Sequence, residues 1–276
     1  MALSFGDNLL SQSDVRETVS NEVTASVNWN LAYSRYIQRF DTGLANELYG
    51  LYISPDGLHA YITRDAGANS YVYEYVMTTP WDVSTMAYVT VKDVTAQDTS
   101  MRGVSFNKDG TKMYVGGISD VDAIHEYDLT TAWDLSTASY LQEFALDNAY
   151  TAFFRPDGKQ MIIPSGAGNL IYSYVLTTAW DVTTAVLINN IAYSAAIDVH
   201  FSSDGAYMFV IDDTTTIKRW ALSTVYDVST AAADSTSMIA PPGTRETGIF
   251  FNLNGTKMYL LIDAYIQEYT IKRGWK

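Results

Sequence analysis

Short runs in which hydrophobic and polar residues alternate recur along the whole chain, and none continues with the period of an amphipathic helix. Alternation with a period of two is typical of β-strands with one buried face. Runs of this apolar or alternating kind include 71–76, 86–91, 103–106, 112–115 and 207–210. Four such runs follow one another in each repeating unit, which predicts an all-β fold.

One type of turn separates the first and second predicted strands of every unit. It is an Asp or Asn followed by Gly, found at Asp56–Gly57, Asp109–Gly110, Asp157–Gly158, Asp204–Gly205 and Asn254–Gly255. The glycine supplies the positive φ that a tight hairpin turn needs. Five turns of this kind predict five units.

A tryptophan, usually followed by Asp, stands between the third and fourth predicted strands. This row consists of Trp29, Trp81, Trp133, Trp180, Tyr226 and Trp275. The spacings are 52 (81−29), 52 (133−81), 47 (180−133), 46 (226−180) and 49 (275−226) residues. A period near 50 is typical of a propeller or a repeat array. We therefore predict a five-bladed β-propeller with four antiparallel strands in each blade.

The two ends of the chain carry complementary parts of one unit. Residues 29–40 align without a gap on 133–144, so they supply an outer strand that has no blade before it. Residues 265–275 stop before the outer strand of the last blade. Pairing the two ends would close the ring and remove its open sheet edges. We expect the propeller to span residues 29–276, with residues 1–28 as an N-terminal arm.

Charge and composition disfavour several classes of partner. The chain has 17 Lys and Arg against 31 Asp and Glu, a net charge of −14, which disfavours nucleic acid and anionic membrane surfaces. It has no cysteine and three histidines, so we expect no disulfide, no metal and no cofactor. No run approaches the roughly 18 apolar residues of a membrane span, and residues 1–7 lack the features of a signal peptide.

The Trp-Asp loop has the recurrence of a scaffold element. In the copy at Trp133, the side chains of Asp134 and Ser136 can bond backbone amides two residues on and fold a turn. We expect the Trp ring to pack between the third and fourth strands, on the same face of the ring as the Asp-Gly turns. The turn aspartates have too few neighbouring carboxylates to predict a calcium loop.

Positions that vary from blade to blade are free to carry a binding function, and they gather on the opposite face. Just before the inner strands stand Tyr49, Arg102, Tyr150, Ile197 and Thr247, and the next row is Gly50, Gly103, Thr151, Asp198 and Gly248. Small residues in the second row suit a tight five-fold axis, where Asp198 is the exception. The predicted ligand-binding residues at this divergent rim are Tyr49, Arg102, Tyr150, Asp198 and Arg245.

Two site chemistries compete at this rim. A sugar-cleaving enzyme would need paired carboxylates there, and the candidates are Glu47, Asp147, Asp198 and Glu246, which do not occupy equivalent rows. We expect His200 to point away from the face that Asp198 occupies. We therefore predict no catalysis, and we keep sugar binding by the rim tyrosines as the alternative.

Units such as Phe106–Val115 followed by Glu126–Thr137 resemble the propeller repeats of structural proteins of tailed bacteriophages, and similar repeats occur in exported bacterial surface proteins. The resemblance covers residues 29–275. It implies a virion component, in a tail, fibre or capsid surface, that assembles as a homo-oligomer and can contribute to attachment to a host-surface glycan. We expect the arm to bind other virion proteins. An exported, extracellular lectin is the alternative.

Overall fold

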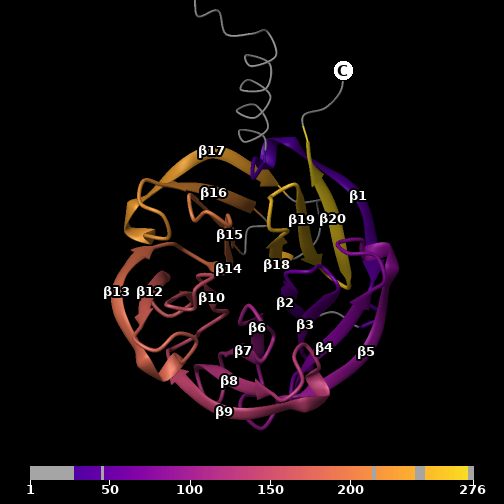
Figure 1. Ribbon diagram of the computed structural model, residues 1–276. Coiled ribbons are helices and arrows are strands. Elements are labelled where there is room, and N and C mark those ends of the chain that lie inside the picture. Colours follow the sequence, from indigo (N-terminus) through magenta and orange to yellow (C-terminus); the bar gives the residue numbers. More distant parts are fainter. Residues whose placement is uncertain (1–27, 45–46, 213–215, 240–245, 273–276) are drawn as a thin grey trace, which may run out of the picture.

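The computed structural model describes residues 28–44, 47–212, 216–239 and 246–272, which form a ring of five antiparallel sheets around a central axis (Figure 1). Each sheet has four strands, as the repeats predict. In each blade the strands are given from the axis outward. Blade 1 consists of β2 (Leu48–Ile53), β3 (His59–Asp65), β4 (Ser70–Met77) and β5 (Met86–Asp93), and blade 2 of β6 (Met101–Phe106), β7 (Lys112–Gly117), β8 (Ala123–Leu129) and β9 (Ala138–Ala145). Blade 3 consists of β10 (Phe153–Phe154), β11 (Gln160–Ser165), β12 (Leu170–Leu176) and β13 (Ala185–Ala192), blade 4 of β14 (Ala196–Phe201), β15 (Tyr207–Asp212), β16 (Thr216–Leu222) and β17 (Ala231–Ile239), and blade 5 of β18 (Glu246–Phe251), β19 (Lys257–Ile262), β20 (Tyr265–Ile271) and β1 (Ser34–Asp41).

The predicted exchange of termini is confirmed. Strand β1 is antiparallel to β20, in a register that runs from Ser34 opposite Ile271 to Asp41 opposite Tyr265, and it completes the fifth blade (Figure 1). The first 27 residues of the predicted arm, and Trp275, lie outside the described residues. In the part of the chain that the structure describes, no helix has the length and hydropathy to cross a membrane.

The Trp row and the Asp-Gly turns lie on one face of the ring, as predicted. The backbone N–H of Trp133 donates to the carbonyl of Gly110 at 3.0 Å, and the other four blades repeat this bond. The predicted place of the ring between the third and fourth strands is wrong. The ring lies on the turn glycine of its own blade, where a Cβ on Gly110 would stand 2.2 Å from Trp133 Cδ2. Because glycine has no side chain, it leaves a flat surface for the indole.

Each Asp or Asn after the Trp row caps one turn of 3-10 helix. Asp134 Oδ1 accepts from the backbone N–H of Ser136 at 2.9 Å and from its hydroxyl at 2.6 Å, which confirms the predicted local turn. The five helical turns are η1 (Leu31–Tyr33), η2 (Val83–Thr85), η3 (Leu135–Thr137), η4 (Val182–Thr184) and η5 (Val228–Thr230). They turn the chain into the outer strands.

The Trp row also joins neighbouring blades through its main chain. All five of its described members have φ between +58° and +67°. In each, the carbonyl accepts a hydrogen bond from a side chain of the preceding blade. The donors are Arg219 to Trp29 (2.9 Å), Tyr259 to Trp81 (2.8 Å), Tyr61 to Trp133 (2.5 Å), Tyr114 to Trp180 (2.7 Å) and Gln160 to Tyr226 (2.8 Å). An equivalent carbonyl therefore joins the neighbouring blades at all five junctions, although the residue type of the donor differs.

Candidate functional site

Two of the predicted rim residues, Tyr49 and Arg102, lie in contact with each other. The guanidinium carbon of Arg102 stands 4.0 Å from the centre of the Tyr49 ring, and its Nη1 donates to Asp65 at 2.9 Å. Tyr49 is buried, so the arginine covers its ring. This pair links the inner strands of the first two blades.

The other rim residues take no part in this cation–π pair. Tyr150 is half-buried, and its ring lies against Gly166 of the same blade, where an added Cβ would stand 2.8 Å from the Tyr150 hydroxyl. Arg245 is outside the described residues. Of the carboxylates considered for catalysis, Glu47 and Asp147 are exposed.

Next to the rim, three glycines of the inner strands lie too close to the neighbouring strand to admit a Cβ. A Cβ on Gly50 would stand 2.6 Å from Gly103 Cα, one on Gly103 would stand 2.2 Å from Thr151 Cβ, and one on Gly248 would stand 2.7 Å from the backbone nitrogen of Leu51. The glycines predicted near the five-fold axis are thus required by close contact with the neighbouring inner strand.

Asp198, in blade 4, stands at the position equivalent to these three glycines and is buried. Its Oδ1 accepts from the backbone N–H of Val199 at 2.8 Å, and its Oδ2 accepts from that of Ile249 in blade 5 at 3.0 Å. Burial raises the pKa of Asp198 from 3.8 to about 7, although the two backbone N–H groups oppose this shift. The carboxyl therefore ties two blades together in a site where its charged form is disfavoured.

This raised pKa predicts a dependence of stability on pH. Below pH 3.8 the carboxyl is protonated in both states, and between 3.8 and about 7 it is ionised only in the unfolded chain. The folded state then binds more protons, so the free energy of unfolding falls as pH rises through this window and levels off above 7. The shift corresponds to roughly 4 kcal/mol over the window.

Urea denaturation from pH 4.5 to 8 measures this slope, and Asp198→Asn supplies the comparison. We expect the free energy of unfolding of the variant to fall less steeply with pH than that of the native protein, whatever its absolute stability, because the asparagine does not titrate. Equal slopes in the two proteins would show that Asp198 does not titrate in this range.

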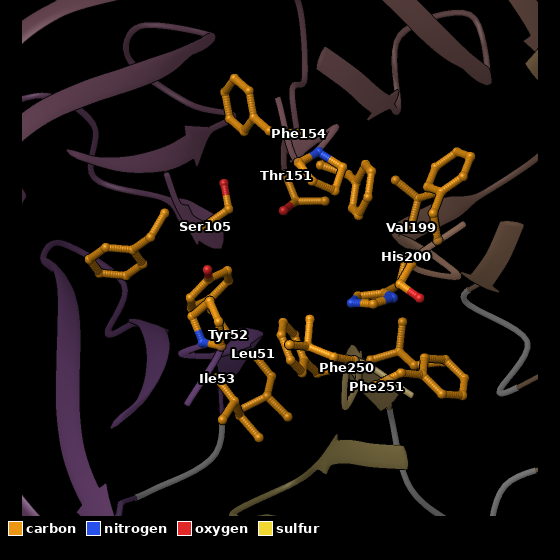
Figure 2. Close-up of a pocket in the computed structure, with 18 of the residues that line it drawn as sticks. Leu51, Tyr52, Ile53, Ser105, Thr151, Phe154, Val199, His200, Phe250 and Phe251 are labelled. Atoms are coloured by element: carbon orange, nitrogen blue, oxygen red, sulfur yellow. The ribbon is translucent and has the colours of Figure 1, made fainter. Parts of the chain in front are cut away.

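Toward the turn face, the inner strands surround a cavity of about 300 Å³. Its mouth is formed by residues of the Asp-Gly turns, and its wall is predominantly apolar. The inner strands contribute one inward-facing row to this wall: Tyr52, Ser105, Phe153, His200 and Phe250. Figure 2 shows Tyr52, Ser105, His200 and Phe250 around one central space. The cavity therefore lies on the face whose loops are nearly constant.

Four members of this row form an incomplete circle of rings. The ring centres of Tyr52 and Phe250 are 5.3 Å apart, those of Phe250 and His200 4.8 Å, and those of His200 and Phe153 5.7 Å. All three pairs meet edge to face, at 69°, 71° and 68°. Such pairs are favoured by the charge distribution of aromatic rings. The fifth place, in blade 2, belongs to Ser105.

Ser105 is 8% exposed, and its Oγ has no hydrogen-bond partner. A buried hydroxyl without a partner costs about 1–3 kcal/mol. Among the described lining residues, two buried polar atoms thus lack a hydrogen-bond partner: Ser105 Oγ, at the gap in the circle of rings, and His200 Nδ1 (Figure 2).

The predicted direction of His200 is wrong. His200 stands two residues after Asp198 on β14, and side chains of a strand alternate with a period of two, so both face the channel and both line the cavity. Burial lowers the pKa of His200 to about 3, so its ring is neutral at pH 7.

None of the five inward-facing side chains was predicted from the sequence: four were not considered as channel residues, and His200 was expected to point away. The signal was available, since this row lies two positions along the strand from the row of Gly50 and varies just as strongly between blades. Among the described residues, no three His, Asp or Glu side chains are grouped to hold a metal ion. The arrangement is suited to binding an uncharged, largely apolar group.

No protein-family model matches the sequence, and no curated protein matches it. Among solved structures, the chain is similar to the crystal structure of a functionally unknown protein from Desulfotomaculum acetoxidans DSM 771, with 13% sequence identity and a TM-score of 0.48. The likeness covers 79% of this chain and spans 63% of the length of that protein. It carries no argument about what the present chain does.

Proposed function

We propose that the chain is a non-enzymatic structural component of a tailed-phage virion, in a tail, fibre or capsid surface, that contributes to host attachment. Its repeats resemble those of such proteins over residues 29–275. The observation that carries the proposal is a band of exposed hydrophobic side chains on the outer strands. We define the outer band as Tyr36, Ile37, Tyr88, Val89, Tyr140, Leu141, Leu187 and Ile188.

The outer band recurs at equivalent positions of four blades. Its members are 42–55% exposed, so about half of each side chain meets solvent. Where each of these outer strands pairs with the adjacent strand of its blade, one residue has no partner. This residue is Ile37, Val89, Leu141 or Ile188, and it marks a β-bulge. In β17 the position equivalent to Tyr88 is Ala233.

These bulges bear on how a partner would bind. A bulge disrupts the hydrogen-bonding edge of a strand and so discourages addition of a further strand. Repeated exposed hydrophobic side chains mark contact surfaces. The outer band therefore favours partners that bind by side-chain packing, as neighbouring subunits of a virion would. We propose that residues 1–28 provide a second attachment to the virion and that the ring assembles as a homo-oligomer.

Purified phage particles provide the test. Mass spectrometry and cryo-electron microscopy should find the chain in a fixed copy number, and a chain found only free in the medium would overturn the proposal. We expect Val89→Asp with Leu141→Asp to keep the ring folded and to reduce incorporation about 30-fold, because each of the two losses of apolar contact weakens binding by roughly 1 kcal/mol. The matched control, Val121→Asp with Val225→Asp, changes exposed valines outside the band. Equal incorporation of the two double variants would contradict the role of the band.

Carbohydrate binding is the second candidate function, favoured by the half-buried Tyr150 beside the segment of Arg102. The backbone N–H of Gly103, the residue after Arg102, donates to the carbonyl of Tyr150 at 2.6 Å. A tyrosine ring at the rim can stack on the apolar face of a sugar. Binding on a glycan array that Tyr150→Ala abolishes would favour this function.

A further inference from the structure

We propose that the cavity binds one small, uncharged planar aromatic molecule with a hydroxyl or N–H group, of the phenol or indole class. Its ring would occupy the fifth place in the circle of rings, and its polar group would hydrogen-bond to Ser105 Oγ. This site is independent of the virion proposal, because it lies in the channel and not on the outer band.

The volume of the cavity fits such a ligand. A cavity of about 150 Å³ lined by apolar side chains can hold benzene, and ligand pockets begin at about 300 Å³. The volume here, about 300 Å³, therefore admits a molecule of one or two rings with little space left over.

The geometry of the wall favours an aromatic ring over other apolar groups. Three successive pairs already meet edge to face, from Tyr52 through Phe250 and His200 to Phe153. A ring beside Ser105 would stand between Tyr52 and Phe153 and could continue the same contacts, each of which adds about 0.5–1.5 kcal/mol beyond the burial of its area.

The charges of the wall favour a neutral ligand. Both oxygens of Asp198 already accept backbone N–H groups, and His200 is neutral. Lys108 stands at the turn-face mouth. An ionised ligand would lose its hydration without gaining a free counter-ion inside the cavity.

The buried Ser105 hydroxyl selects for a polar substituent. It can donate to or accept from a phenol hydroxyl, and it can accept from an indole N–H. Oγ has no protein partner but is itself buried, so a turn about the Cα–Cβ bond of Ser105 would present it to a ligand in the cavity.

Isothermal titration calorimetry of the full chain tests the proposal with phenol, indole and benzene as probes. We expect phenol and indole to bind with dissociation constants of about 1 mM or below, in the range open to ligands of this size. Benzene should bind roughly 2- to 12-fold more weakly, since it lacks the hydrogen bond. Absence of phenol and indole binding would overturn the proposal, and so would tighter binding of tetramethylammonium, which would indicate a cation site.

Two variants of Ser105 locate the ligand. Ser105→Phe fills the fifth place, so it should abolish binding of all three probes, whereas Ser119→Phe, on an exposed loop outside the cavity, should not. Ser105→Ala should weaken phenol by the same roughly 2- to 12-fold and leave benzene unchanged. Unchanged phenol binding in folded Ser105→Phe would overturn the site. If Ser105→Phe does not fold, equal loss of phenol and benzene in Ser105→Ala would overturn the predicted hydrogen bond.

Discussion

Replacing Gly50 with alanine is expected to destabilise the ring by about 3 kcal/mol or more. Gly50 has a φ of +54°, and an added Cβ would stand 2.6 Å from Gly103 Cα and 2.9 Å from the backbone nitrogen of Val104. A left-handed conformation costs a residue with a side chain roughly 1–2 kcal/mol, and overpacking costs about 1–3 kcal/mol more. The neighbouring atoms belong to the backbone of the next blade, so they cannot move aside without opening the ring.

Gly67→Ala is the matched control. Gly67 also has a positive φ, +85°, but an added Cβ there would have no atom within 4 Å. Urea denaturation should therefore show the cost of backbone conformation alone, roughly 1–2 kcal/mol. If Gly50→Ala costs no more than Gly67→Ala, the contact between inner strands is not tight.

Replacing Trp29 with alanine should lower the free energy of unfolding by about 4 kcal/mol, near the middle of the range for buried large-to-small aromatic changes. Trp29 is buried, and its ring centre lies 5.3 Å from that of Phe251 and 6.0 Å from that of Phe209. It also covers Gly255, in the turn of the last blade. The side chain thus fastens the N-terminal segment to the blade that this segment completes.

Trp29→Tyr is the comparison that the fold itself supplies, because Tyr226 fills the equivalent place on Gly205. We expect the tyrosine variant to retain more than half of the stability that alanine loses, as measured by thermal and urea unfolding. A loss below about 1 kcal/mol in Trp29→Ala would show that pairing of β1 with β20 alone closes the ring.

Two positions show why the site was harder to predict than the fold. The His200 prediction misjudged direction, although the period of a strand was sufficient to place it on the channel side with Asp198. Ser105 is different: it looks like an ordinary strand residue, and its significance depends on Tyr52 and Phe153, which come from the blades on either side. Equivalent positions of the blades can be identified from the sequence repeats, but the distances between side chains of different blades cannot.

The sequence by itself determined the number of blades, the four strands of each and the exchange of termini. These follow from local rules, since Asp-Gly turns and alternating runs act over a few residues and recur with the repeat. Only the tertiary structure decided the junctions and the cavity. Tyr61 reaches the carbonyl of Trp133, 72 positions along the chain, and Asp198 reaches Ile249, 51 positions along. Such contacts depend on the tilt and spacing of whole sheets, which residue periodicity does not encode.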